Sequence, residues 1–233
     1  MTDLPCLYSG PMVRAILREI ASPGTGKTQT RRVMPEWPPI CTSRGTPLVQ
    51  CKDGVYRSPP TRYKVGDRLW VREAWRLPDC EDDISPADFV KRLIDCEMPG
   101  PNGLVRFEAD GRDAWGDEYP DLPLGRVRAG MHLPRILSRI TLTVTEVRVQ
   151  RLQDISEADA IAEGAYKGKA SGRYADNYAM MAIAGQWFAS SRAWYADLWD
   201  RINGRGAWDL NPWVAAYTFT PYLTNIDAME AVA

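Results

Sequence analysis

The first segment whose residue types suit a chemical role is 21–28, Ala-Ser-Pro-Gly-Thr-Gly-Lys-Thr. It fits a relaxed phosphate-binding loop in which alanine replaces the first glycine. Such a loop binds phosphate only when a buried strand precedes it and a helix N-terminus follows it. Here residues 12–20 have the apolar spacing of a helix, and residues 29–39 contain three prolines and too few apolar side chains for the required helix. We therefore interpret the match as coincidental and expect no nucleoside triphosphatase.

Histidine and cysteine content limits other kinds of site. The chain has one histidine, His132, which excludes any site that needs two histidine ligands. It has five cysteines and no Cys-x-x-Cys pair, so we expect reduced thiols rather than a disulfide framework or a zinc knuckle. His132 lies beside Pro134 and Arg135 in an expected loop, and we interpret it as structural or facing nucleic acid. We expect no metal and no cofactor.

The elements that must position a site follow from hydrophobic periodicity and turn residues. Residues 33–66 are expected to be largely irregular because of their prolines, and the tail after Pro221 is expected to be loosely held. Residues 139–149 alternate as strands, with a bulge or tight turn near Thr145-Glu146 where the apolar phase changes. Ser156 is the predicted cap of a short helix that ends at Gly164. The remaining predictions are helices over 12–20, 86–94 and 185–202, and strands over 68–75 and 213–219.

Length and charge bound the class of protein. The 233 residues are 45% apolar and 25% charged, which is ordinary globular composition. No apolar run reaches the roughly 18 residues of a membrane helix, and the first ten residues do not resemble a secretory signal, so we expect a cytoplasmic protein. The net charge is −1. Residues 1–79 carry a surplus of +6 and residues 122–153 of +5, whereas residues 80–121 carry −8. The two basic segments are compatible with one basic face, or simply with solvated surfaces.

Lys27-Thr28-Gln29-Thr30-Arg31-Arg32, placed after an amphipathic helix and a glycine-containing turn, resembles the ASCH domain family of the PUA-like superfold. That family shows a lysine, a threonine three residues later and an arginine two further on, here Lys27, Thr30 and Arg32. Further matches follow in order: Gly66-Asp67 before a strand, the strands at 139–149, and the segment 154–164. Segments 198–203 and 211–214 are similar to longer, phage-associated members. The resemblance covers about residues 7–220; the turn before Lys27 is longer than usual, and residues 76–130 are an insertion.

The resemblance implies a function. Some ASCH proteins are amidohydrolases that remove the acyl group from N4-acetylcytidine, and their catalytic lysine, threonine and glutamate correspond to Lys27, Thr30 and Glu163. Other members are proposed to bind RNA, and at least some cleave it. Fold resemblance alone does not select among these activities.

The physical chemistry of these residues is compatible with catalysis. Arg31 and Arg32 lie close to Lys27, and neighbouring positive charge together with partial burial lowers the pKa of an amine toward that of a general base. The Thr30 hydroxyl would then be the nucleophile and Glu163 the acid. In the alternative interpretation Lys27 and Arg32 bind phosphate, and Glu163 is a solvated residue at a helix end.

Three more residues are candidates for substrate binding. Trp70 and Arg72 alternate onto one face of the predicted strand 68–75, where an aromatic ring and a guanidinium can stack a nucleobase. Core packing is the alternative for Trp70 and for Trp75. Arg139 begins the next predicted strand and is the third candidate, with Arg31 and Arg32 completing the expected substrate-binding set.

These observations predict one α+β domain over residues 1–220, a small PUA-like (ASCH) β-barrel flanked by helices, with an acidic surface insertion at about 76–130 and a loosely ordered tail over 221–233. The predicted function is an amidohydrolase that removes an N4-acyl group from cytidine or a related nucleoside. The expected partners are that substrate and RNA, with no membrane and no metal. The alternatives are a non-catalytic RNA-binding or regulatory module of a phage, and a ribonuclease.

Overall fold

A computed structural model describes residues 1–34, 41–43, 46–96, 104–111, 123–165, 180–181 and 187–229. The chain forms two compact units, each built from segments that are far apart in sequence. Unit 1 comprises Met1–Pro23, Asp67–Thr143 and Pro221–Ala233, and unit 2 comprises Gly24–Gly66 and Val144–Thr220. The sequence predicted one domain over 1–220, and it contained no signal for this division.

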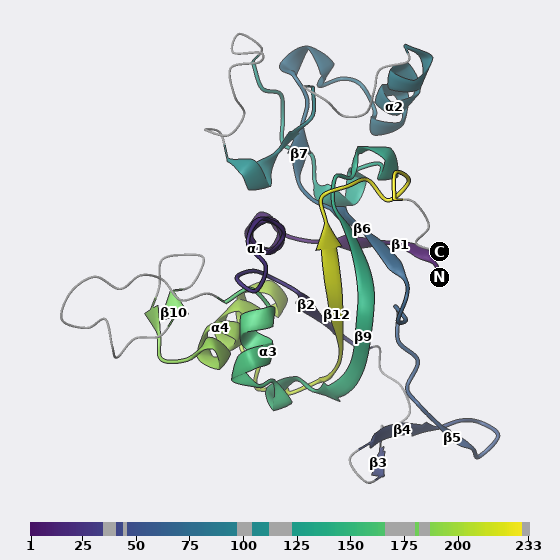
Figure 1. Ribbon diagram of the computed structural model, residues 1–233, viewed down its shortest axis with the longest axis vertical. Helices are drawn as coiled ribbons and strands as arrows, with labels where there is room; N and C mark the ends of the chain where they lie inside the picture. The colour runs from purple at the N-terminus through teal and green to yellow at the C-terminus, as the bar shows by residue number, and fades with distance from the viewer. Residues whose placement is uncertain are drawn as a thin grey trace. The chain divides into compact units, whose positions relative to one another are not determined.

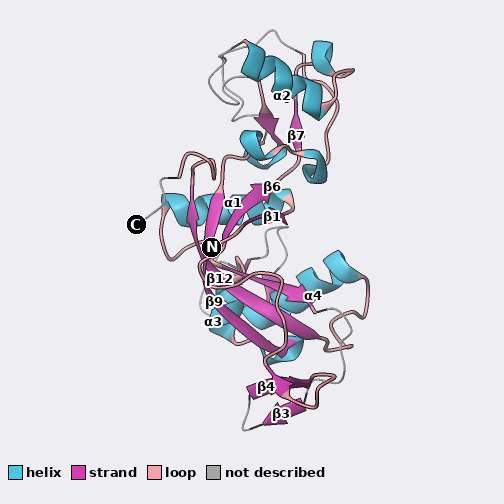
Figure 2. Ribbon diagram, turned by 90° about the vertical axis from the view of Figure 1, so that its right-hand side faces the viewer, coloured by secondary structure: helices cyan, strands magenta, loops and turns pink. Residues whose placement is uncertain are grey.

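A mixed sheet of five strands is the main β structure (Figures 1 and 2). Its hydrogen-bonded order is β1 (Asp3–Leu7), β6 (Arg68–Arg72), β9 (Thr141–Arg151), β12 (Trp213–Tyr222) and β2 (Gln29–Val33). β1 is parallel to β6, whereas β6 pairs with β9 and β12 with β2 in antiparallel fashion. The strands described here form no closed barrel. The α+β class is therefore as predicted, and the barrel is not seen.

In unit 1, α1 (Gly10–Ala21) confirms the helix predicted over 12–20. Pro11 occupies its first turn, where a missing N–H costs nothing, and its buried residues are Met12, Val13, Ala15 and Ile16. The strand predicted over 68–75 is interrupted: β6 ends at Arg72, and the short strand β7 (Trp75–Arg76) pairs instead with β8 (Arg106–Phe107).

The segment predicted as an acidic surface insertion has a hydrophobic core of its own. Its helix α2 (Pro86–Asp95) confirms the prediction over 86–94, with the Ser85 hydroxyl accepting a hydrogen bond from the Asp88 backbone N–H as a cap. Figure 2 shows α2 beside β7. The core consists of Trp75, Leu77, Phe89, Leu93, Val105, Phe107, Leu133 and Leu137. The acidic residues therefore cover a packed subdomain of unit 1 rather than a surface loop.

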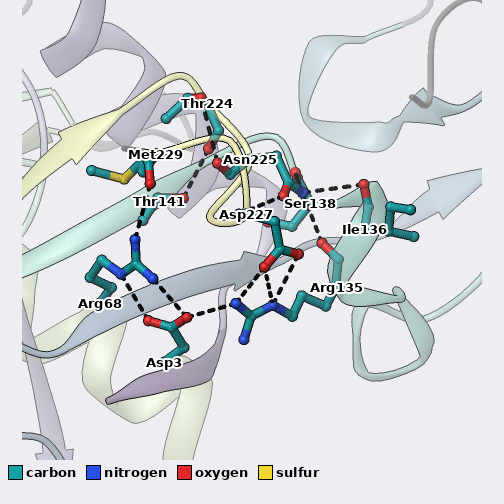
Figure 3. Close-up of polar contacts among 10 residues, drawn as sticks. All are labelled: Asp3, Arg68, Arg135, Ile136, Ser138, Thr141, Thr224, Asn225, Asp227 and Met229. Carbon is teal, nitrogen blue, oxygen red and sulfur yellow. Dashed lines mark hydrogen bonds and ion pairs between the residues drawn. The ribbon is translucent and has the colours of Figure 1, made fainter. Parts of the chain in front are cut away.

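Residues 224–229, predicted to be loosely held, are tied to the rest of unit 1 (Figure 3). The Asn225 amide donates to the backbone oxygens of Arg135, Ile136 and Ser138 at 2.9, 3.2 and 2.6 Å. Arg135 also forms an ion pair with Asp227 and with Asp3. Burial acts to raise the pKa of Asp3, but hydrogen bonds from Arg68 and Arg135 outweigh it and hold the pKa below its usual value. The tail is thus anchored by polar contacts that apolar periodicity does not reveal.

Asn225→Ala should lower the free energy of unfolding by about 1–3 kcal/mol, because it removes three donated hydrogen bonds at once. Urea denaturation followed by tryptophan fluorescence measures this change. Asp227→Ala is the matched control: its carboxylate is 55% exposed, so its ion pair with Arg135 should contribute much less. Equal midpoints for Asn225→Ala and the wild type would show that the segment is not anchored as described.

Unit 2 departs from the sequence predictions in three places. Residues 33–66 contain a small sheet of β3 (Cys41–Ser43), β4 (Thr46–Gln50) and β5 (Tyr56–Arg57), so the irregular assignment was wrong for this part. Residues 141–151 form one continuous strand, β9, without the predicted turn. Its phase changes because burial gives way to half-exposure after Val144. The last predicted helix starts later, at Ser191, and the call over 185–186 lies outside the described residues.

The helices of unit 2 pack against each other (Figure 1). α3 (Glu157–Ala162) is capped by Ser156 as predicted, and Glu163 is its last, C-capping residue. α4 (Ser191–Asn203) buries Trp194, Tyr195 and Trp199, with the short strands β10 (Met180–Met181) and β11 (Trp187–Phe188) before it. The short 3-10 turns are Asp79–Glu81, Glu108–Asp110, Gly130–His132, Arg135–Leu137 and Leu152–Asp154. Among the described residues, no helix is long and apolar enough to cross a membrane.

Candidate functional site

Lys27 and Glu163, which are 136 residues apart in sequence, form a buried ion pair in unit 2. The Lys27 amine donates to the Glu163 carboxylate Oε2 at 2.5 Å and to the Glu163 backbone oxygen at 2.9 Å. Lys27 is 1% exposed and Glu163 is 2% exposed. The structure therefore places two of the three predicted catalytic residues in direct contact.

Arg31 and Tyr195 complete the contacts of the same carboxylate. Arg31 Nη1 donates to Glu163 Oε1 at 3.0 Å, and the Tyr195 hydroxyl donates to that oxygen at 3.4 Å. The Arg31 guanidinium also lies 5.8 Å from the centre of the Tyr195 ring. We call Lys27, Arg31, Glu163 and Tyr195 the Glu163 cluster. Both oxygens of its carboxylate are held by donors, which fixes their orientation.

Local backbone structure explains how these side chains meet. Lys27 lies two residues before β2, and the next residue, Thr28, donates its backbone N–H to the Ala162 backbone oxygen at 2.8 Å. This bond joins the start of β2 to the last turn of α3. Gly164 follows with φ +112, a conformation that favours glycine, and ends the helix immediately after Glu163. The short helix and the strand entrance therefore deliver the two partners to one place.

Burial changes the proton affinity of this cluster. Loss of solvation lowers the pKa of Lys27 below its usual 10.5, and the charges of Arg32 and Arg31 act in the same direction. The ion pair with Glu163 opposes that change without cancelling it. Burial and the nearby Glu163 charge also raise the pKa of Tyr195 well above 10.0, so its hydroxyl keeps its proton. Lys27 is thus an amine whose protonated form is weakened by its surroundings.

Ion pairs extend the Glu163 cluster along α3. Arg31 Nη2 lies 3.0 Å from Asp159 Oδ2, and Arg148 Nη2 lies 2.7 Å from Asp159 Oδ1. Asp159 precedes Glu163 by four residues, a spacing that puts both carboxylates on one side of a helix. Arg31 therefore bridges two carboxylates, and a continuous path of ion pairs runs from Lys27 to Arg148.

Thr30 and Arg32 lie on β2 itself. Thr30 is 4% exposed and pairs with Tyr217 of β12, whereas Arg31 pairs with Ala216. Successive residues of a strand point to opposite faces, so Thr30 and Arg32 share the face of Tyr217, and Arg31 lies on the face of α3. Lys27 precedes the strand and is not subject to this alternation. The contact of Lys27 with Glu163 is seen directly, whereas no side-chain contact links Thr30 to the described part of the cluster.

The remaining predicted substrate residues belong to unit 1. Trp70 is 6% exposed, and the Arg72 guanidinium lies 4.4 Å from the centre of its ring. Arg139 donates to the carboxylates of both Glu73 and Asp110 and lies 4.1 Å from the centre of the Phe107 ring. Burial raises the pKa of Glu73, although Arg139 opposes that change. Within unit 1 these side chains are engaged with one another.

Other sequence interpretations can be compared with the structure. The helix α1 precedes residues 21–28 and the strand β2 follows them, which is the reverse of a phosphate-binding loop. His132 is exposed in a 3-10 turn. The described parts of the chain contain no group of three His, Cys, Asp or Glu side chains suited to a metal ion. Cys6, Cys51, Cys80 and Cys96 are free thiols.

Sequence reasoning missed Tyr195, Asp159 and Arg148 as members of the network. Asp159 had an available signal, since it stands one helical turn before Glu163. Tyr195 was assigned only to an apolar row of its helix. Searches of family models, of curated proteins and of solved structures found no match to this chain.

Proposed function

We propose that this protein is an amidohydrolase that removes an N4-acyl group from cytidine or a related nucleoside. The observation that carries the proposal is the buried contact between Lys27 and Glu163, with the pKa of Lys27 lowered by burial. A buried amine and carboxylate in contact can hold one proton between them, and proton transfer across the pair yields a neutral base and a neutral acid together.

The reaction then needs four residues. The Thr30 hydroxyl attacks the acyl carbonyl carbon and gives its proton to the Lys27 amine. Protonated Glu163 donates its proton to the N4 nitrogen as the C–N bond breaks, which releases cytidine and leaves the acyl group on Thr30. Water hydrolyses this ester to the carboxylic acid and restores the hydroxyl. Arg32, on the face of Thr30, stabilises the negative oxygen of the tetrahedral intermediates.

The assignment of Thr30 depends on the sequence resemblance. Strand alternation places Thr30 on the β2 face opposite Arg31. The acyl group must therefore reach Thr30 at the start of the strand, where the backbone of Lys27 enters β2. A water molecule that replaces Thr30 as the attacking group would need the same Lys27–Glu163 pair. The proposal thus separates into a proton-transfer pair and a nucleophile that can be tested independently.

A non-catalytic RNA-binding or regulatory module is the second candidate. It is favoured by the burial of Lys27 and Glu163, because a cluster with paired charges also ties β2, α3 and α4 together without chemistry. In that case the Glu163 cluster supports the fold, and basic surface residues bind the nucleic acid. Ribonuclease activity belongs to the same test.

Incubation with N4-acetylcytidine distinguishes these functions. We expect purified protein to release cytidine and acetate, as separated by liquid chromatography, at equal rates with and without EDTA. A labelled oligoribonucleotide in the same reaction reports cleavage. Absence of cytidine release from N4-acetyl-, N4-propionyl- and N4-benzoylcytidine, together with salt-sensitive RNA binding, would support the binding module instead.

A further inference from the structure

Unit 2 contains an open groove that the proposed chemistry does not use. Its volume is about 570 Å³, which lies within the range of small-molecule sites. It lies between the end of β4, the segment 58–65 and the second half of β9. The lining residues are Pro47, Ser58, Pro59, Thr61, Lys64, Val65, Val147, Arg148, Val149 and Gln150.

Two residues of β9 bring unused hydrogen-bond donors to this groove. Arg148 and Gln150 are two positions apart and therefore share one face of the strand. The Gln150 amide nitrogen is buried and has no hydrogen-bond partner in the described part of the chain. Arg148 Nε likewise has none there, since its ion-pair neighbour Glu146 Oε1 is 3.6 Å away. Buried donors without acceptors favour a ligand that supplies oxygen atoms.

The charge around the groove has the matching sign. Residues 46–66 contain four basic residues and one acidic residue, Asp53, which pairs with Arg57. None of the ten lining residues is acidic. Two carboxylates face Arg148 from outside the lining, Glu146 at 3.6 Å and Asp159 at 2.7 Å. Asp159 holds only one guanidinium nitrogen, Nη2, and a guanidinium has five N–H donors, so Arg148 is oriented without being saturated.

We propose that this groove binds a phosphate group, carried by a nucleotide or by an RNA strand, through Lys64, Arg148 and Gln150. The valine and proline side chains provide an apolar wall for the adjoining sugar or base. The path Arg148–Asp159–Arg31–Glu163 connects this phosphate site to the Lys27 pair. This inference extends the proposed function, because it makes the substrate a phosphorylated nucleoside or RNA rather than a free nucleoside.

Isothermal titration at low salt tests the proposal with four probes: cytidine, cytidine 5′-monophosphate, inorganic phosphate and a six-nucleotide RNA. We expect the phosphate-bearing nucleosides to bind at least tenfold more tightly than cytidine, and the affinity to fall as salt rises. Preference for the monophosphate identifies a nucleotide ligand, whereas preference for the RNA identifies a strand. Lys64→Glu and Gln150→Leu should each weaken binding at least tenfold. Lys52→Glu makes the same charge change at an exposed residue outside the groove and should stay within twofold of the wild type.

Equal affinity for cytidine and its monophosphate would overturn the phosphate site, as would equal weakening by Lys64→Glu and Lys52→Glu. Binding of an oligoglutamate peptide in preference to every phosphate probe would also overturn it. Because titration requires no turnover, the two proposals fail separately. Phosphate binding without deacylation contradicts the amidohydrolase, and deacylation of free N4-acetylcytidine without phosphate binding contradicts this groove.

Discussion

Glu163→Gln should lower the turnover of N4-acetylcytidine by about a hundred- to ten-thousand-fold while KM changes little. The amide keeps the shape of the carboxyl group but has no acidic proton to give to the leaving nitrogen. The same change should lower the free energy of unfolding by about 3–5 kcal/mol, because Lys27 loses the carboxylate that compensates its burial.

The stability loss of Glu163→Gln should depend on pH in a defined direction. Glu163 is the group that opposes the lowering of the Lys27 pKa, so without it that pKa falls further below 10.5. Between the folded and unfolded pKa values the unfolded chain binds more protons, and stability therefore rises with pH. Urea denaturation at several pH values below 10.5 measures this slope.

A double variant separates support of the fold from catalysis. Lys27→Met with Glu163→Leu removes both charges and should recover much of the stability lost by Glu163→Gln. Arg31 keeps its ion pair with Asp159 in this variant. Activity should remain absent. Wild-type turnover in Glu163→Gln, or in the double variant, would limit the Glu163 cluster to a structural role.

Lys27→Arg should reduce deacylation as severely as removal of the amine, although the positive charge is kept. A guanidinium does not lose its proton near neutrality and therefore cannot accept one from the nucleophile. Steady-state kinetics of Lys27→Arg and Lys27→Met measure the comparison. An active Lys27→Arg enzyme would make Lys27 an electrostatic anchor.

Two neighbouring threonines provide a matched pair for the nucleophile. Thr30→Ala should be severe, whereas Thr28→Ala should be mild, since the described role of Thr28 lies in backbone bonds to Ala162 and Phe219. Thr30→Ser should restore part of the activity because it restores a hydroxyl. Retained activity in Thr30→Ala, with Lys27→Arg inactive, would assign the attack to water. ATP hydrolysis that depends on Thr28 would instead revive the phosphate-binding loop.

Local signals in the sequence sufficed for several elements. Apolar residues at helical spacing in 12–20, the serine caps at Ser85 and Ser156, and the glycine after Glu163 each act within one turn of chain. Where the signal was tertiary, the predictions failed. Strand β6 ends at Arg72 because Trp75 pairs with Phe107 in the insertion, a partner more than thirty residues away. The single strand β9 resembled two because its second half is exposed.

The candidate site was predictable to a similar extent. Lys27 and Glu163 followed from motif resemblance, and the structure brings them into contact. Arg31 was expected to bind substrate, yet it bridges Glu163 and Asp159, because strand alternation directs it toward α3. Tyr195 comes from a helix whose strongest sequence feature is tryptophan packing, and nothing in its spacing indicates a carboxylate partner. Long-range polar contacts of this kind require the fold.

The pH dependence of N4-acetylcytidine deacylation tests the central claim most directly, because that claim is one proton held by the Lys27–Glu163 pair. Activity should be highest when the pair carries a single proton and should fall on both sides. The alkaline limb marks loss of that proton, and its midpoint should lie below 10.5 because burial lowers the pKa of Lys27. A rate that is independent of pH, or that still rises through pH 10.5, would contradict the account.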